Sequence, residues 1–327
     1  MELRFDDILE AEKNLKGVVR RTPLFYSSTF SDKSGASLYL KCENKQKTGA
    51  FKIRGAYNKL SSLTEEEKSR GVIAASSGNH AQGVAYAASV FGVKSTIVMP
   101  VTAPAAKVQA TKGYGAEVVQ AGIVYDECYA KALEIQKETG AVFLHPFDDN
   151  FVMAGQGTIG LEIMQDLPET DVVVVPVGGG GLISGIATAV KSMKPEIRVV
   201  GVEPEVIASA KASLEKGEVT TLPAAASLAD GIVVATPGAK CFNSLKKYVD
   251  EIVTVSDAEI AQAIFSLLQR GKLLAEGAGA SALAAILSGK VTGIQGKNVA
   301  VVISGGNIDL AKVYEIVGER KNEVCSA

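Results

Sequence analysis

The chain has 327 residues, of which 47% are apolar and 21% charged, and its 34 basic and 36 acidic side chains give a formal net charge of -2. This composition excludes intrinsic disorder, and the charge leaves no basic surplus for binding nucleic acid. The longest apolar runs are shorter than the roughly 20 residues that span a membrane. We therefore expect a globular protein of one large or two smaller α/β domains, without a nucleic-acid or membrane partner.

The N-terminal residues and the cysteines bear on the compartment. The first seventeen residues alternate charged and apolar side chains like an amphipathic helix and lack the apolar core of a signal peptide. Cys42, Cys128, Cys241 and Cys325 show no C-x-x-C pair and no metal-type spacing. Scattered cysteines of this kind are typical of reduced thiols. The sequence therefore predicts a cytoplasmic protein without a zinc site or a disulfide framework.

Short β-branched runs alternate with helix-length segments along the chain. The expected strands are 37–43, 71–75, 95–99, 116–120, 171–177, 197–203, 251–255 and 297–304. Gly92 and Gly140 are typical of residues that end a helix. The continuous run from Val172 to Val175 indicates a parallel strand buried on both faces. The alternation predicts βαβ units and an α/β fold with doubly wound sheets.

Two short turn-like regions interrupt this alternation of strands and helices. A polar, proline-containing turn spans 145–150, and a second region lies at 69–71. If both are hinges, residues 70–148 form a small mobile domain, inserted into a large domain made of residues 1–69 and 149–327.

A run of glycines follows the predicted strand 171–177 and precedes a helix. It consists of Gly178, Gly179, Gly180 and Gly181, with Leu182 next. Consecutive glycines let several backbone N–H groups point at one anion, and a helix N-terminus adds partial positive charge. No Lys-Ser/Thr pair follows, which excludes a triphosphate P-loop. Taken alone, the run indicates either a phosphate cup or a tight strand-to-helix turn.

Lys52 lies in the segment TGAFKIRGA, between Phe51 and Ile53. Most lysines are solvated surface residues, which is the ordinary interpretation. A lysine desolvated by such neighbours would instead have a lowered pKa and act as a Schiff-base nucleophile. The sequence leaves both interpretations open.

Small polar side chains follow two predicted strands. Ser76, Ser77, Asn79 and His80 come after strand 71–75, and Ser304 stands at the end of strand 297–304. Serine and asparagine favour helix N-caps, so a structural role is the default. The carboxyl ends of parallel strands are also where open α/β sheets bind ligands. Either role fits the sequence.

A further glycine pattern supports a competing hypothesis. Gly155, Gly157 and Gly160 match G-x-G-x-x-G, but the residues ahead of them make a poor strand. We interpret them as part of a closely packed glycine-rich helix. A nicotinamide-dependent oxidoreductase or a non-catalytic phosphate-binding module remains the alternative that rests on this match.

The motifs together, in the order KTGAFKIRGA, SSGNHAQG, GGGGL and SGGN, resemble the fold-type II pyridoxal-phosphate enzymes, specifically the threonine/serine dehydratase and serine racemase group. The resemblance covers nearly the whole chain, and GQGTIGLE and LADG add to it. It implies a tryptophan synthase β-like fold, with two doubly wound open-sheet domains and the cofactor, pyridoxal 5'-phosphate, between them. The length resembles the short catabolic dehydratases, and the resemblance implies a homodimer or homotetramer.

The resemblance also implies roles for individual residues. Lys52, beside Phe51, would bind the cofactor as a Schiff base and later act as the base at the substrate Cα. The other cofactor contacts would be those of Gly178, Gly179, Gly180, Gly181 and Leu182 with the phosphate, Asn79 with the 3-hydroxyl, and Ser304 with the pyridine nitrogen. The substrate carboxylate would be held by Ser76, Ser77, Asn79 and His80.

The implied activity is that of an L-threonine/L-serine ammonia-lyase, which gives 2-oxobutyrate or pyruvate, plus ammonia, by β-elimination. The alternative is a serine racemase that interconverts L- and D-serine, with Lys52 and Ser77 as its two acid/bases. Phe147 weighs against this alternative, because the mammalian racemase carries an asparagine in the corresponding turn. The small-molecule partner is an amino acid in both cases.

The racemase branch also binds a divalent cation. Glu203 matches its glutamate ligand and Ile207 its backbone carbonyl, but Ser209 stands where an aspartate would be. Losing a charged oxygen ligand weakens a site for a hard cation. The expected ion is Mg2+, Ca2+ or a monovalent cation.

Overall fold

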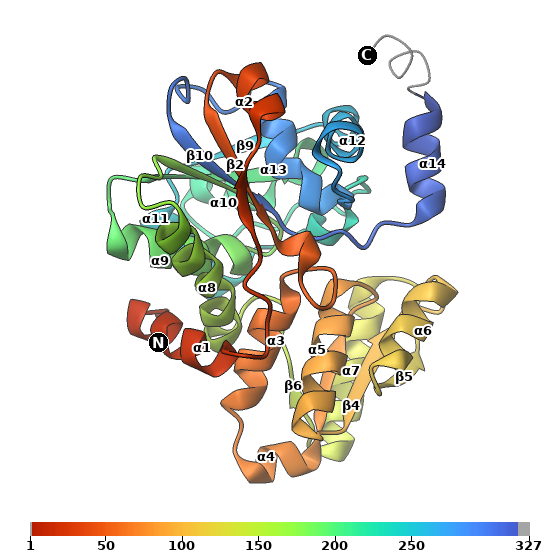
Figure 1. Ribbon diagram of the computed structural model, residues 1–327. Coiled ribbons are helices and arrows are strands. Elements are labelled where there is room, and N and C mark those ends of the chain that lie inside the picture. Colours follow the sequence, from red (N-terminus) through yellow and green to blue (C-terminus); the bar gives the residue numbers. More distant parts are fainter. Residues whose placement is uncertain (1, 320–327) are drawn as a thin grey trace.

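The chain folds around two sheets with helices on both faces of each (Figure 1). The computed structural model describes residues 2–319. Cys325 and the last residues of the predicted large domain therefore lie outside the described residues. In the described part, no helix has the length and apolar character needed to cross a membrane.

The larger sheet has six strands, of which only the first is antiparallel to its neighbour. The strands in spatial order are β1 (Leu24–Tyr26), β2 (Ser37–Cys42), β10 (Asn298–Ile303), β7 (Val172–Pro176), β8 (Arg198–Pro204) and β9 (Glu251–Val255). Its helices are α1 (Phe5–Leu15), α2 (Ser28–Ser34), α8 (Asn150–Asp166), α9 (Gly181–Met193), α10 (Ser209–Lys216), α11 (Ala239–Tyr248), α12 (Asp257–Ser266), α13 (Gly277–Leu287) and α14 (Leu310–Glu319). Short helical turns are η1 (Glu43–Lys45), η2 (Glu205–Ile207), η3 (Asp230–Ile232) and η4 (Leu267–Gly271).

The smaller sheet has four strands, all parallel. In spatial order they are β5 (Glu117–Gln120), β4 (Ser95–Met99), β3 (Val72–Ala75) and β6 (Val142–Phe143). The helices in this part of the chain are α3 (Lys52–Ser61), α4 (Glu65–Arg70), α5 (Asn79–Phe91), α6 (Ala105–Gly113) and α7 (Tyr125–Thr139). All eight strands expected from the sequence are present, and β1 and β6 are additional short ones.

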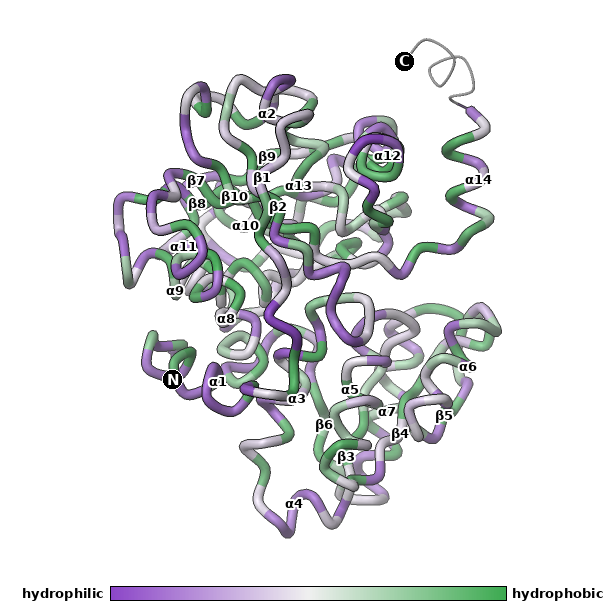
Figure 2. Tube along the Cα trace, viewed as in Figure 1, coloured by the Kyte–Doolittle hydropathy of each residue, from purple (hydrophilic) through white to green (hydrophobic). Residues whose placement is uncertain are grey.

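The central strand β7 explains why the larger sheet is covered on both sides. Successive side chains of a strand point to opposite faces. Val172 and Val174 pack in the core cluster with α13, whereas Val173 and Val175 pack in the cluster with α9. Colouring the chain by hydropathy shows apolar stretches through both sheets and a hydrophilic α4 at the surface (Figure 2). The doubly wound arrangement predicted from the valine run is confirmed.

Helix α3 links the two sheets. It packs against α5 beside the smaller sheet and against α8 beside the larger one. Ala56 and Leu60 lie in the same core cluster as residues of β3 and β4, although the predicted boundary assigns them to the large domain. The boundaries at residues 69 and 149 stay a prediction.

The glycines at 155, 157 and 160 lie inside α8. A Cβ on Gly157 would come within 2.9 Å of the carbonyl oxygen of Gly185 in α9. The glycines therefore let two helix backbones approach closely, as the helical interpretation predicts, and the dinucleotide alternative loses its sequence support.

Candidate active site

A cavity of about 660 Å³ collects the residues that the sequence singled out. Its size is within the roughly 300–1,000 Å³ of small-molecule sites. Loops at the carboxyl ends of β3, β7 and β10 contribute to its wall. The predicted cofactor and substrate residues that line it are Phe51, Lys52, Ser76, Ser77, Asn79, His80, Gly178, Gly179, Gly180, Gly181, Leu182 and Ser304. The fold thus brings segments more than 200 residues apart into one site.

Lys52 is the first residue of α3 and is partly exposed to the cavity. Its Nζ donates a hydrogen bond to the carbonyl oxygen of Pro146 at 2.7 Å and lies 5.2 Å from the centre of the Phe51 ring. Burial lowers the pKa of Lys52 from 10.5 to about 8, while the charges of Cys241 and Glu276 oppose this shift. The amine therefore has a larger neutral, nucleophilic fraction near neutral pH than a surface lysine.

The glycine run forms a cradle at the start of α9. Gly180 has φ +95°, a conformation that favours glycine, and its Cβ would lie 2.9 Å from that of Cys241. A Cβ on Gly179 would lie 2.5 Å from the Phe147 ring. Helix α9 begins at Gly181, which lines the cavity, and the N-terminus of a helix of thirteen residues carries partial positive charge. The cradle suits an anion such as a phosphate.

The loop after β3 does not cap α5 with its side chains. Gly78 is the N-cap residue of α5, and no side chain accepts a hydrogen bond there. Ser76 Oγ instead accepts from the Gly78 N–H at 3.2 Å. The default capping interpretation is therefore wrong for Asn79, because this residue already belongs to the helix. Ser77 and Asn79 line the cavity.

His80 differs from the other residues of this loop. Its ring Nε2 lies 2.9 Å from the carbonyl oxygen of Leu144, which can only accept a hydrogen bond. Burial, followed by the charge of Lys52, lowers the pKa of His80 to about 3. The imidazole is therefore neutral near pH 7 and offers no positive charge to a substrate carboxylate.

Glu276, Asn307, Lys107 and Asp230 also line the cavity, although the sequence-based site does not include them. Asn79 Nδ2 donates to Glu276 Oε1 at 2.5 Å, and Asn307 Nδ2 donates to Asn79 Oδ1 at 2.8 Å. Lys107 and Asp230 form an ion pair, with 3.6 Å between Nζ and Oδ2. Asp230 belongs to the LADG motif and Asn307 to the SGGN motif, so these two motifs could have identified them as site residues. No sequence motif marks Glu276 or Lys107.

The residues proposed for a cation are used otherwise. The carboxylate of Glu203 accepts from the backbone N–H groups of Ala210 and Lys211, both at 2.9 Å. Ser209 Oγ donates to the carbonyl oxygen of Val234 at 2.7 Å. Among residues 2–319 no group of three or more His, Cys, Asp or Glu side chains is placed to hold a metal ion. Of the predicted ligands, only Ile207 lines the cavity.

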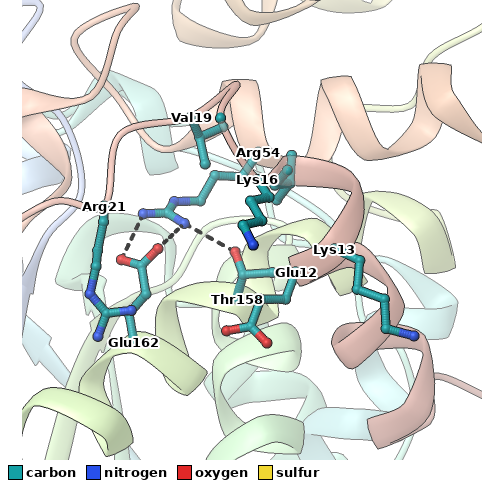
Figure 3. A pocket seen from close by; sticks show the side chains of 10 residues that line it. Glu12, Lys13, Lys16, Val19, Arg21, Arg54, Thr158 and Glu162 are labelled. Carbon is teal, nitrogen blue, oxygen red and sulfur yellow. Dashed lines mark hydrogen bonds and ion pairs between the residues drawn. The ribbon is translucent and has the colours of Figure 1, made fainter.

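A buried ionic cluster holds the helix that carries Lys52. Arg54 is fully buried, and its guanidinium bonds to Glu162 Oε1 at 2.7 Å, Thr158 Oγ1 at 3.1 Å and Glu43 Oε1 at 2.8 Å. Lys41 Nζ donates to the same Glu162 at 2.5 Å. Figure 3 shows Arg54 reaching Glu162 and Thr158 at the wall of a second, 520 Å³ cavity. These bonds tie α3 to α8 and η1, and tie α8 to β2.

The residues present fit pyridoxal phosphate. Lys52 supplies a desolvated amine, the glycine cradle an anion site, and Asn79 and Ser304 polar contacts in the same cavity. A side chain at Gly179 would collide with the Phe147 ring and one at Gly180 with Cys241, so the backbone of the run can approach these neighbours only as glycine.

Comparisons with known proteins agree with this geometry. Residues 15–305 match the family model described as "Pyridoxal-phosphate dependent enzyme". The chain is 56% identical to the L-threonine ammonia-lyase of Thermotoga maritima over 317 residues, 97% of this chain and 79% of the relative. It is 49% identical to the catabolic L-threonine dehydratase TdcB of Escherichia coli K12 over 97% of both chains. A solved structure of maize serine racemase superposes with a TM-score of 0.93 at 35% identity, covering 99% of each chain.

These findings confirm the resemblance and the fold that it implied. The matched region includes all four motifs apart from the last residues of SGGN. The chain therefore belongs to the family of pyridoxal-phosphate dependent enzymes.

Proposed function

We propose that this protein is an L-threonine ammonia-lyase that also deaminates L-serine, releasing 2-oxobutyrate or pyruvate together with ammonia. The observation that carries the proposal is the desolvated Lys52 amine, in one cavity with the glycine cradle and the Ser76 loop. The relatives named L-threonine ammonia-lyase and L-threonine dehydratase, 56% and 49% identical, support this substrate.

The predicted site residues in the cavity suit this reaction. Pyridoxal phosphate, when bound, withdraws electrons from the substrate Cα. Lys52 would hold the cofactor and would act as the base at the substrate Cα, and its pKa of about 8 suits an amine that accepts a proton near neutral pH. The glycine cradle would hold the phosphate, and Asn79 would hold the 3-hydroxyl. Ser304 meets the pyridine nitrogen with a neutral hydroxyl, which stabilises a positive charge there less than a carboxylate would.

The substrate carboxylate is proposed to lie against Ser76, Ser77 and Asn79. Because His80 is neutral and bonded to Leu144, its contribution is its backbone N–H in the first turn of α5, and not a charged ring. The Lys107–Asp230 pair lies at the same cavity. Closure of the part of the chain that carries α6 over the substrate would exclude water from the reaction.

The test is the release of 2-oxobutyrate from L-threonine by the purified holoenzyme. We expect turnover in the wild-type protein and none above background in Lys52→Ala. Borohydride reduction of the wild-type holoenzyme should leave the cofactor on the peptide that contains Lys52. A wild-type holoenzyme that leaves L-threonine unchanged, or a Lys52→Ala variant that retains turnover, would contradict the proposal.

Serine racemase activity is a second candidate, because Ser77 lines the cavity and maize serine racemase has the same fold at 35% identity. In this case Ser77 would exchange a proton with Cα on the face opposite Lys52. Ser77→Ala should then abolish the formation of D-serine and spare the elimination of L-serine. Equal loss of both activities would show that Ser77 has no separate role in racemisation.

The finer expectations on metal, assembly and compartment are proposals too. A homodimer or homotetramer predicts a mass of two or four 34.0 kDa chains in light scattering. The cation site at Glu203, Ile207 and Ser209 predicts a higher melting temperature with Mg2+ or Ca2+; an unchanged melting temperature with either ion and with a chelator would refute it. Location in the cytoplasm is tested by fractionation of the source cells.

A further inference from the structure

A chain of hydrogen bonds runs along one wall of the active-site cavity. Asn307 Nδ2 donates to the carbonyl oxygen of Thr48 and to Asn79 Oδ1, both at 2.8 Å. Asn79 Nδ2 in turn donates to Glu276 Oε1 at 2.5 Å. Asn79, Glu276 and Asn307 all line the cavity. This series of hydrogen bonds joins four segments that are distant in the sequence, at Thr48, Asn79, Glu276 and Asn307.

These bonds leave the Asn79 amide one orientation. The Thr48 carbonyl can only accept, so the Asn307 NH2 group faces it and also faces Asn79. The oxygen of Asn79 must then point at Asn307 and its NH2 group at the Glu276 carboxyl. An NH2 group has two hydrogens, and the hydrogen bonds among the described residues use one of them. The second N–H is available to a ligand in the cavity.

Close packing holds Glu276 in place at one end of this series of hydrogen bonds. Glu276 is 7% exposed, and its Oε1 collides with any side chain placed on Gly305 of the SGGN motif. At the other end, a side chain on Gly49 would collide with Asn307. The two glycines therefore make room for the polar groups. The charged groups that face the Glu276 carboxyl are Asp230 from η3, Lys107 from α6 and Lys52 from α3.

We propose that Glu276 and Asn307 are positioning residues, which clamp the Asn79 amide so that its remaining N–H points at the 3-hydroxyl of the cofactor, and that the charge on Glu276 tunes this contact. The inference rests on the proposed contact between Asn79 and pyridoxal phosphate. It assigns a role to the buried carboxyl that the elimination reaction itself does not use.

The ionisation of Glu276 gives the clamp a measurable signature. Burial, followed by the charge of Asp230, raises its pKa to about 7, against the lowering effects of Asn79, Lys107 and Lys52. A carboxylate that forms near pH 7 strengthens the bond to Asn79 and places a negative charge near the 3-hydroxyl. The absorption spectrum of the bound cofactor should therefore change with pH around this value.

The first experiment is a pH titration of the visible absorption band of the holoenzyme, in the wild type and in Glu276→Gln. Glutamine keeps the size and an acceptor oxygen but does not titrate. We expect a spectral transition with a midpoint near pH 7 in the wild type and its loss in the variant. A transition that persists unchanged in Glu276→Gln would overturn the proposed tuning by this charge.

The second experiment measures the dissociation constant of pyridoxal phosphate by equilibrium titration. Asn307→Ala and Glu276→Ala each remove one restraint on Asn79, and we expect about tenfold weaker binding in each, as for the loss of one good hydrogen bond. The matched control is Asn58→Ala. Asn58 is buried, donates to the Phe151 carbonyl and accepts from Asn14, and does not line the cavity.

The control variant should bind the cofactor within about twofold of the wild type. If Asn307→Ala does the same, the clamp is refuted, and this variant decides the question even where Glu276→Ala does not fold. Neither readout requires L-threonine. The two proposals can therefore fail separately. An enzyme that does not act on L-threonine could still show the predicted effects on cofactor spectrum and binding, and an active L-threonine ammonia-lyase could lack them.

Discussion

At the scale of single residues, the lowered pKa of Lys52 makes the pH dependence of cofactor attachment predictable. Only the neutral amine attacks an aldehyde, and burial lowers its pKa to about 8. The rate of appearance of the visible band, after apoprotein is mixed with pyridoxal phosphate, should rise with pH and level off above a midpoint near 8. A rate that still rises with the ordinary lysine pKa of about 10.4 would contradict the desolvation of Lys52.

A second residue-scale prediction concerns the glycine cradle. Gly180→Ala places a Cβ 2.9 Å from Cys241 on a backbone with φ +95°, and we expect a loss of roughly 1–3 kcal/mol in the free energy of unfolding. Gly92→Ala is the control for backbone strain alone, because φ is +66° there and no atom lies within 4 Å of its Cβ. Only Gly180→Ala should also weaken cofactor binding. Equal effects of both variants on that binding would refute the cradle.

At the scale of elements, the ionic cluster around Arg54 should determine how firmly α3 is held. Glu162→Gln leaves the fully buried Lys41 without its charged partner and leaves Arg54 paired with Glu43 alone, and removing one member of a buried pair costs about 3–5 kcal/mol. The control Glu66→Gln, on the exposed pair with Arg70, should cost less than about 1 kcal/mol. Urea unfolding measures the loss of stability in both variants. Similarly small losses in the two variants would contradict the role of the ionic cluster in holding α3.

The same cluster predicts an acid sensitivity. Burial acts to raise the pKa of Glu162, but Arg54 and Lys41 outweigh it and hold the pKa below 4.5. A carboxyl with a lowered folded-state pKa contributes stability above its unfolded pKa, and that contribution is lost as the pH falls through the folded value. The stability difference between the wild type and Glu162→Gln should therefore shrink below about pH 4.5. A stability difference that grows on acidification would contradict this prediction.

Sequence patterns predicted most of these elements but not the cluster. The strands, the glycine run and the loops after β3 and β10 depend on local periodicity and turn chemistry, which the sequence displays directly. Arg54 and Glu162 are 108 positions apart, so nothing local marks them as partners. The same holds for Glu276 and Asn79, which are 197 positions apart, and for the neutral state of His80, which depends on the depth of its burial.

At the scale of the whole molecule, the Lys107–Asp230 pair joins α6, beside the smaller sheet, to η3, beside the larger one. Asp230 is 68% exposed, so the pair itself should contribute at most about 1 kcal/mol to stability. Because both residues line the cavity, Lys107→Ala should raise the KM for L-threonine severalfold with little change in melting temperature. An unchanged KM would show that the pair has no role at the substrate.

The central claim is that this molecule uses Lys52 to eliminate water from L-threonine, after which hydrolysis of the unsaturated product takes up water and releases 2-oxobutyrate and ammonia. The most direct measurement is proton NMR of the holoenzyme with L-threonine and, separately, L-serine in D2O, together with chiral analysis of the remaining amino acid. We predict rapid formation of 2-oxobutyrate with little D-serine or Cα-deuterated substrate, and no reaction in Lys52→Ala. Abundant D-serine with slow formation of pyruvate would contradict the account and make racemisation the main activity.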